Sequence, residues 1–169
     1  TSAEVLMKSA IKRDPEYVDA LLGLVQVWFG MEDTGLISSE QFISRSAPIL
    51  DRVDGLDPGN GLLLGMRSKH AQIRGESAAE AKLLERAITA SPGNANLYSM
   101  YADYLLGERN SEDALTQLNK AIQLDPLNAN FYRSRANYLM QLQRFEEAEQ
   151  AALKSLVDEV RCDLVLTTG

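Results

Sequence analysis

The sequence predicts an all-α fold made of helical hairpins stacked one on the next. Three prolines, Pro58, Pro92 and Pro126, recur at a constant 34-residue spacing in a chain of 169 residues. The six residues that end at each proline are alike, and they read Val53-Asp54-Gly55-Leu56-Asp57-Pro58, Ala87-Ile88-Thr89-Ala90-Ser91-Pro92 and Ala121-Ile122-Gln123-Leu124-Asp125-Pro126. A period of this length indicates a solenoid of hairpins, because one hairpin alone cannot bury both of its apolar faces. The apolar fraction of 45% is enough for a continuous core.

The first two segments depart from the regular period. Residues 1–17 supply only the second helix of a repeat, so the chain begins with half a repeat. The repeat over 18–60 is nine residues longer than 34, and we expect the extra residues in a loop between its helices, around 30–38. The capping box Ser38-Ser39-Glu40-Gln41 predicts the start of its second helix. Within that helix Pro48 removes one backbone hydrogen bond, so we expect it to kink or delay the helix.

Regular repeats follow over 61–94, 95–128 and 129–156. Large residues at fixed positions are expected to fill the space between helices, and small ones to let the backbones approach. In the middle repeat these positions hold Tyr98, Tyr101, Ala102, Leu105, Ala114, Leu118 and Ala121. Gly30 and Gly107 suit helix ends, and Ser77-Ala78-Ala79-Glu80 reads as a second capping box. Residues 157–169 form a tail, and its apolar, β-branched end over 163–169 is expected to fold over the last hairpin or to fray rather than to be helical.

This pattern of large and small residues over 34 positions resembles the tetratricopeptide-repeat (TPR) family. The resemblance implies an α–α superhelix whose first helices line a concave groove that binds a protein or peptide partner. The groove-facing positions that it implies are Asp19, Leu22, Gln26, Phe29, Leu62, Met66, Lys69, Gln72, Asn96, Ser99, Met100, Asp103, Asn130, Arg133 and Asn137. More loosely, the long repeat and the Leu-Asp-Pro endings are similar to the helical-repeat regions of bacterial multidomain regulators and cyclases.

The groove-facing positions predict a mostly apolar floor with a few polar groups, which is the general form of a binding surface. The floor would be formed by Leu22, Phe29, Leu62, Met66 and Met100. Met66 and Met100 are equally compatible with ordinary core positions. Lys69 and Arg133 would supply positive charge, and the asparagines would bind an extended backbone. The resemblance would also allow a clamp that binds the C-terminal carboxylate of a chaperone. We do not expect one, because the position equivalent to Lys69 in the next repeat holds Asp103 instead of another positive donor.

No catalytic or metal-binding constellation is apparent. The chain has one histidine, His70, and one cysteine, Cys162, and neither stands in a spacing that a metal site or a nucleophile–base pair requires. Gly-rich phosphate loops and nucleophile elbows are absent from the sequence. The acidic cluster of Glu146, Glu147 and Glu149 reads as a solvated helix surface. We therefore predict a protein that is not an enzyme and needs no cofactor.

Charge and hydropathy argue against two classes of partner, nucleic acids and membranes. The net charge is −7, and the basic residues are scattered among acids, so we expect no nucleic-acid binding. No apolar run reaches the roughly 18 residues of a membrane span, so we expect no membrane insertion. A cytoplasmic location is favoured, and a periplasmic one fits a larger exported or membrane protein. The half repeat at residues 1–17 leaves an apolar flank, which predicts a homo-oligomer formed through the N-terminal end.

Two functional hypotheses remain from the sequence. The first is a protein–protein interaction module, a scaffold or adaptor that binds a peptide or a partner domain in its groove. The alternative is a regulatory, sensor or assembly segment of a larger bacterial multidomain regulator or assembly factor.

Overall fold

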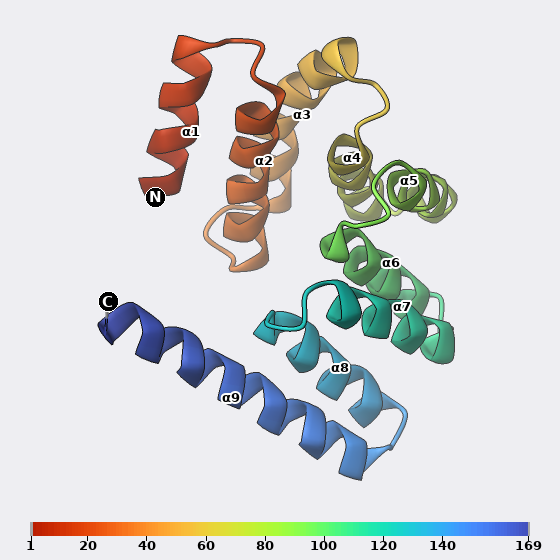
Figure 1. Cartoon of the computed structure of the whole chain (residues 1–169). Helices are drawn as coiled ribbons and strands as arrows, with labels where there is room; N and C mark the ends of the chain where they lie inside the picture. The colour runs from red at the N-terminus through yellow and green to blue at the C-terminus, as the bar shows by residue number, and fades with distance from the viewer. Residues whose placement is uncertain (1, 169) are drawn as a thin grey trace. The chain divides into compact units, whose positions relative to one another are not determined.

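The computed structural model describes the backbone of residues 2–168 and the side chains of residues 2–157. This described part consists of nine helices joined by short turns, and it contains no strand. The prediction of an all-α helical-repeat fold is confirmed. The helices belong to two compact units, Thr1–Ser91 and Pro92–Gly169 (Figure 1).

The first unit contains five helices. They are α1 (Ser2–Arg13), α2 (Val18–Asp33), α3 (Ser39–Leu56), α4 (Gly61–Ile73) and α5 (Ser77–Ala90). Each of these helices packs on its neighbours along the chain, and α2 also contacts α4. The core consists of apolar side chains at helical spacing, among them Val25, Phe42, Val53, Leu63 and Leu84, none of which is exposed to solvent. Burial of these side chains supplies the main stabilisation of the unit.

The nine extra residues of the long repeat do not form the loop that we expected over 30–38. Helix α2 has 16 residues where α4 has 13, and α3 has 18 where α5 has 14. Seven of the nine residues therefore lengthen the two helices, and only two widen the turn between them. Gly30, expected at a helix end, lies inside α2. Of the apolar residues in this stretch, Met31 is half-buried and Ile37 is buried.

Helix α3 begins at the predicted capping box and continues through its proline. The Ser38 hydroxyl accepts a hydrogen bond from the Gln41 backbone at 3.2 Å, and the Gln41 side chain accepts one from the Ser38 backbone at 3.0 Å. The helix then runs without interruption from Ser39 to Leu56, so Pro48 does not delay it. Pro48 is exposed, and so is Ser44, the residue whose carbonyl group it leaves without a helical donor.

The second unit contains four helices, α6 (Ala95–Gly107), α7 (Ser111–Leu124), α8 (Ala129–Gln141) and α9 (Phe145–Thr168). The pairs α6–α7 and α8–α9 form hairpins, and α7 packs against α8. Their core alternates small residues such as Ala102, Ala114 and Ala121 with large ones such as Leu118 and Leu139. This alternation brings the helices close together, as the sequence predicts.

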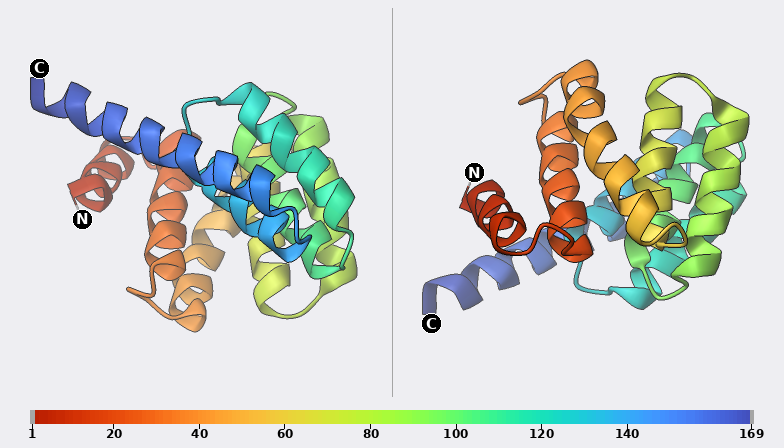
Figure 2. Two further views of the ribbon diagram at one scale, coloured as in Figure 1. Left: turned by 90° about the horizontal axis from the view of Figure 1, so that it is seen from below. Right: turned by 90° about the horizontal axis from the view of Figure 1, so that it is seen from above.

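Helix α9 is longer than the helix it packs against. The hydroxyl of Ser155 donates to the carbonyl oxygen of Ala129, the first residue of α8, at 3.0 Å. From that point α9 continues to Thr168 and runs past the beginning of α8 (Figure 1 and Figure 2). The expectation that residues 163–169 are not helical is wrong for 163–168, and residue 169 lies outside the described residues. Val and Leu lower helix propensity by only a few tenths of a kcal/mol each, and no Pro or Gly interrupts this segment before its last residue.

The last three connections between repeats use the same asparagine cap. Asn60, Asn94 and Asn128 recur at the spacing of the prolines, and the side-chain oxygen of each accepts hydrogen bonds from the first backbone N–H groups of α4, α6 and α8. The amide groups of Asn60 and Asn128 also donate to the preceding aspartates, Asp57 at 3.0 Å and Asp125 at 3.3 Å. This cap is formed by the residue that follows Asp/Ser-Pro-x, and it was not among the features predicted from the sequence.

The turns inside the hairpins also repeat. Helices α2, α4, α6 and α8 are each followed by a residue with positive φ, namely Gly35, Gly75, Arg109 and Gln143. The backbone N–H of the next residue bonds five positions back in each case, for example Glu76 to the carbonyl of Ala71 at 2.9 Å. This is the Schellman arrangement, which satisfies the last carbonyl groups of a helix. Gly107, expected at a helix end, is the last residue of α6, but Arg109 is the residue that takes the left-handed conformation.

Candidate functional site

The structure separates the groove-facing positions into two sets. In the first unit, Leu22 and Met66 are each only 2% exposed and belong to the core. They do not form a floor that a partner could touch, so for these two residues the structure favours the core interpretation. Asp19, Gln26 and Gln72 are exposed, and Leu62 is half-buried.

Lys69, predicted to offer positive charge to a partner, is held inside the first unit. Its amino group lies 3.4 Å from a carboxylate oxygen of Glu32 and donates to the Gln72 side chain at 3.0 Å. The same amino group lies 5.3 Å from the centre of the Phe29 ring, which in turn contacts Phe42. Lys69 is half-buried. The positive charge of Lys69 is therefore largely compensated within the protein, and the Lys69 side chain covers Phe29.

His70 has a structural role in this unit. It is buried, and its Nε2 lies 2.7 Å from the hydroxyl oxygen of Ser46, which also donates to the carbonyl of Phe42 at 2.6 Å. Its ring meets Phe42 edge-on at a centroid distance of 5.4 Å. Burial, together with the charges of Arg74 and Arg67, lowers the pKa of His70 below its ordinary value of 6.5. The Ser46 hydroxyl has no access to solvent, so this pair links α3 to α4 rather than forming a nucleophile and its base.

The second unit presents the remaining predicted positions at its surface. We call the six polar residues on its first helices the α6–α8 polar face; they are Asn96, Ser99, Asp103, Asn130, Arg133 and Asn137. They form three pairs at 34-residue spacing. Five of them are exposed, and Ser99 is half-buried. Met100 is also half-buried, and Met140, which was not among the predicted groove residues, is exposed at the end of α8.

Contacts within the second unit hold this face in place. The hydroxyl of Tyr138 on α8 donates to a carboxylate oxygen of Asp103 on α6 at 2.5 Å. Burial and the negative charge of Asp103 both raise the pKa of Tyr138, so the phenol remains a donor across the range in which proteins are folded. The guanidinium of Arg133 donates to the side-chain oxygen of Asn130. Sequence reasoning placed Asp103 and missed Tyr138, whose position in its repeat is also a tyrosine in the preceding one, Tyr104.

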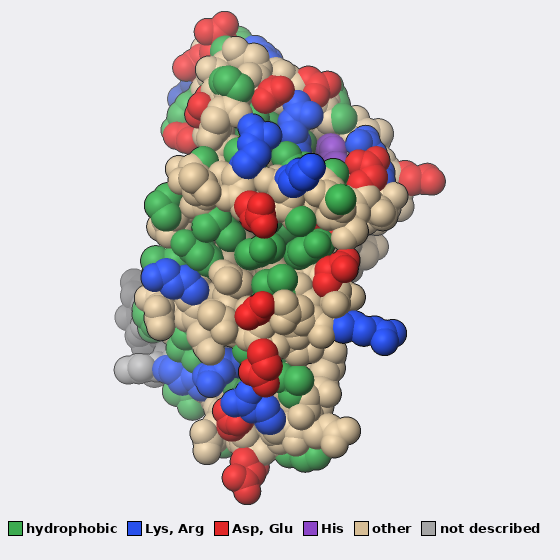
Figure 3. Space-filling model, turned by 90° about the vertical axis from the view of Figure 1, so that its right-hand side faces the viewer, with side chains coloured by type: hydrophobic (Ala, Val, Ile, Leu, Met, Phe, Trp, Pro, Cys, Tyr) green, Lys and Arg blue, Asp and Glu red, His purple; other side chains and the backbone are tan. Residues whose placement is uncertain are grey.

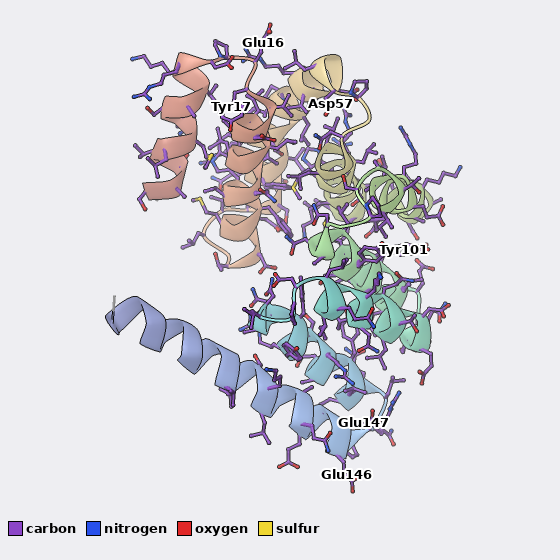
Figure 4. All side chains as sticks on the ribbon, in the orientation of Figure 1. Glu16, Tyr17, Asp57, Tyr101, Glu146 and Glu147 are labelled. Atoms are coloured by element: carbon purple, nitrogen blue, oxygen red, sulfur yellow. The ribbon has the colours of Figure 1, made fainter. Side chains whose placement is uncertain are left out.

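Aromatic residues support α6 beside the polar face. Tyr101, labelled in Figure 4, stacks on Tyr104 with the ring planes 7° apart and the centroids 5.9 Å apart. The hydroxyls of Tyr98 and Tyr132 donate to the carbonyl oxygens of Pro92 and Pro126, both at 3.1 Å. Each of these tyrosines ties the start of a first helix to the turn before it, which limits the freedom of the polar residues that follow.

A small polar pocket of about 150 Å³ lies elsewhere on the second unit, between α7, α8 and the start of α9. Arg144 makes two short hydrogen bonds to Glu147, at 2.6 and 2.8 Å, and lies 3.6 Å from Glu112. Arg135 also lines the pocket, and its Nε has no hydrogen-bond partner. The two arginines and two glutamates balance in charge, and the one hydroxyl group among the lining residues, that of Thr116, donates to the backbone carbonyl of Glu112 at 3.0 Å. Glu147 and its neighbour Glu146 are labelled in Figure 4.

Among the described residues, no group of three or more His, Cys, Asp and Glu side chains could hold a metal ion. None of the helices described is long and apolar enough to cross a membrane. On the face drawn in Figure 3, lysines and arginines are interspersed with aspartates and glutamates. Such a surface lacks the single-sign stripe that phosphate-backbone binding requires.

Comparison with known proteins gives two kinds of likeness. The sequence profile of the tetratricopeptide repeat matches residues 100–161. Comparison with curated proteins found no matching sequence. Solved structures are similar in fold, and their low sequence identities restrict the likeness to the fold.

Three of these structures illustrate the likeness. A crystal structure of MamA aligns with a TM-score of 0.64 at 20% identity, covering 93% of this chain and 86% of that one. TTC0263, a thermophilic TPR protein of Thermus thermophilus, aligns with a TM-score of 0.64 at 18% identity, covering 82% of this chain and 72% of that one. YrrB, described as a TPR protein with an unusual peptide-binding site, aligns with a TM-score of 0.60 at 15% identity, covering 97% and 80%.

The sequence pattern, the helical hairpins and these likenesses agree. The 34-residue period recurs in the proline endings, in the asparagine caps and in the left-handed turn residues. The described helices have the fold of solved tetratricopeptide-repeat proteins, and residues 100–161 match the sequence profile of that repeat.

Proposed function

We propose that this chain is a non-enzymatic protein-interaction module that binds an extended peptide segment of a partner on the α6–α8 polar face. The observation that carries the proposal is the array of exposed amide side chains, Asn96, Asn130 and Asn137, on two adjacent first helices. An amide side chain both donates and accepts hydrogen bonds, as each peptide unit of an extended segment does. Such an array therefore suits a backbone rather than one particular side chain.

The electrostatics of this face favour a segment that carries at least one acidic group. Arg133 is exposed on it, and Asp103 already accepts a hydrogen bond from Tyr138. A carboxylate from the partner would meet the guanidinium of Arg133 in a charge-assisted hydrogen bond. Met100 and Met140 lie at the borders of the face and offer adaptable apolar contacts to neighbouring side chains.

The first unit contributes less to this proposal. Its corresponding residues Leu22 and Met66 are buried, and Lys69 is paired with Glu32. YrrB, a structural neighbour, is described as having an unusual peptide-binding site, which supports peptide binding as a property compatible with this fold. The proposal of a non-enzymatic module rests on the buried state of His70 and Ser46 and on the charge-balanced pocket of the second unit.

The test selects peptides from a random displayed library on the full chain and measures their affinity by calorimetry. Asn137→Ala and Arg133→Ala are each expected to weaken binding by about fivefold to tenfold, since one hydrogen bond contributes about 1 kcal/mol and a charge-assisted one more. Asn119→Ala and Gln123→Ala on α7 are matched controls, because both residues are exposed amides of the same unit outside the polar face. Selected peptides that bind equally to the polar-face variants and to wild type would contradict the proposed site.

A further inference from the structure

Two helices at the ends of the chain expose apolar side chains that nothing in their own unit covers. On α1, Val5 and Leu6 are 67% and 66% exposed, although the opposite side of this helix is fixed to α2. On α9, Leu153, Leu156 and Val157 are 56%, 57% and 53% exposed, whereas Ala148, Ala151 and Ser155 on its other side are buried. Large apolar residues that cluster on one exposed helix face mark interaction surfaces.

The orientation of α1 is set by specific contacts. The indole N–H of Trp28 donates to the carboxylate of Glu4 at 3.2 Å, and Lys8 pairs with the same carboxylate at 2.7 Å. A Cβ atom on Gly23 would lie 2.9 Å from the sulfur of Met7, so α1 and α2 approach closely there. With Glu4 and Met7 directed toward α2, the face that carries Val5 and Leu6 points away from it.

Charge divides each of these faces into two halves. On α1 the apolar pair is followed toward the C-terminal end by the exposed cations Lys12 and Arg13. On α9 the order is reversed, because the exposed acids Glu146 and Glu149 come first and the three apolar residues follow. An antiparallel pairing of α1 with α9 therefore sets apolar against apolar and basic against acidic.

The spacing of the two halves agrees as well. Seven residues separate the middle of Val5–Leu6 from the middle of Lys12–Arg13, which is about 10 Å along a helix at 1.5 Å per residue. Nearly eight residues separate the middle of Glu146–Glu149 from the centre of the apolar trio on α9, which is about 12 Å. The apolar and the charged contacts can thus form together in one register.

We propose that the partner of these surfaces is a second copy of this chain, with α1 of one copy packed antiparallel on α9 of the other. The contact is heterologous, so each copy carries one surface of each kind, and association extends beyond two copies unless a closed ring or dimer forms. A contact of one helix with one helix is smaller than the roughly 1,200 Å² of a standard interface, so association is expected in the micromolar range or weaker. The sequence predicts self-association through the N-terminal end, and the proposed contact adds the surface on α9 that α1 would bind.

The test measures molar mass by sedimentation equilibrium of the full chain over a wide concentration range. Wild type is expected to exceed the mass of one chain as concentration rises. Val5→Glu/Leu6→Glu, which disables the α1 surface, and Leu153→Glu/Leu156→Glu, which disables the α9 surface, are each expected to remain single chains. A mixture of the two variants is expected to form pairs of one copy of each, because one intact surface of each kind remains.

Matched controls distinguish this contact from nonspecific association of exposed apolar side chains. Leu36 and Leu127 are 68% and 66% exposed and lie in turns outside both surfaces, so Leu36→Glu and Leu127→Glu are expected to associate as wild type does. Circular dichroism of every variant checks that the helices remain folded. If Leu153→Glu/Leu156→Glu unfolds, the charge variants described next test the same surface without touching the apolar residues.

Charge reversal tests the register. Lys12→Glu/Arg13→Glu and Glu146→Lys/Glu149→Lys are each expected to weaken association by about tenfold, and a mixture of the two to regain it, because two exposed ion pairs contribute up to about 1 kcal/mol each. A wild-type mass of one chain at all concentrations would overturn the proposal. So would an α1 variant that associates like wild type, or complementary variants that do not pair on mixing.

Discussion

The two units of this protein are built from the same repeat but differ in which positions of it remain exposed. In the second unit the first helices keep a regular length, and their polar residues reach solvent on the α6–α8 polar face. In the first unit α2 and α3 are longer, and residues of the next first helix, α4, contact them, as Lys69 does with Glu32 and His70 with Ser46. The longer hairpin thus contacts the first helix of the next repeat, α4, and leaves less of that helix available to a partner.

The largest expected effect tests whether the two units share one kind of core. Leu84 and Leu118 occupy the same repeat position, and neither is exposed. Leu84→Ala and Leu118→Ala are each expected to lower the free energy of unfolding by about 2–5 kcal/mol, because each leaves a cavity. Urea denaturation followed by circular dichroism measures both. A difference between them larger than about 2 kcal/mol would mean that the cores are not equivalent.

The next effect concerns the buried pair of the first unit. Ser46→Ala removes the partner of the His70 ring and is expected to cost about 1–3 kcal/mol, the range for a buried polar group left without its hydrogen bond. Ser44→Ala, an exposed serine on the same helix, is the matched control and is expected to change stability by less than about 0.5 kcal/mol. Equal stabilities of the two variants would show that the His70–Ser46 contact contributes nothing.

The pH dependence of stability follows from the same histidine. The pKa of His70 is lowered in the folded chain below its unfolded value of 6.5, so the unfolded chain takes up the proton first as the pH falls. The stabilisation is therefore complete above pH 6.5 and decreases from there toward the lower folded pKa. His70→Phe is expected to lose this part of the pH dependence, measured by urea denaturation at pH values about one unit above and below 6.5. An unchanged pH profile in the variant would contradict the assignment.

A smaller effect is expected in the second unit. Tyr138→Phe removes the hydrogen bond to Asp103 and is expected to destabilise by about 1 kcal/mol, because Asp103 is exposed and water replaces the lost donor. Tyr104→Phe, at the same position of the preceding repeat, is the control. If the polar face depends on this bond, peptides selected on the wild type bind more weakly to Tyr138→Phe than to the control.

The smallest effects come from the turns. Gly75, Arg109 and Gln143 share the left-handed conformation, and a Cβ on Gly75 would meet no atom within 4 Å. Gly75→Ala is therefore expected to cost about 1 kcal/mol through the backbone alone, and Arg109→Gly to stabilise by somewhat less, because glycine loses more freedom on folding. Thermal unfolding of the two variants in parallel measures whether each substitution lowers or raises the stability. Destabilisation by Arg109→Gly would show that its side chain matters more than its backbone.

Most of the architecture was predictable because the repeat encodes it several times. The prolines fix where repeats end, and the small residues Ala102, Ala114 and Ala121 fix where helices approach. The expected loop over 30–38 was wrong because a count of extra residues does not say whether they lengthen helices or a turn. The helical course of 163–168 was missed because β-branched residues were given more weight than the absence of a helix breaker.

The candidate site was less predictable. Of the predicted groove-facing residues, Asn96, Asn130 and Asn137 are exposed, whereas Leu22 and Met66 are buried. Whether a residue at a given position reaches solvent depends on the side chains that neighbouring helices pack against it, which the period does not report. The Tyr138–Asp103 bond joins residues about one repeat apart on different helices, and only a pair of complementary polar side chains at that separation could have suggested it.

The asparagine caps have a consequence for how such a chain changes over time. Each cap is completed by residues within a few positions of its own turn, so a break placed between one proline and the next leaves both new junctions with the groups they need. Whole repeats could thus be duplicated or deleted without leaving a helix end unsatisfied. Evolution can adjust the number of hairpins, and with it the reach of the protein, in discrete steps.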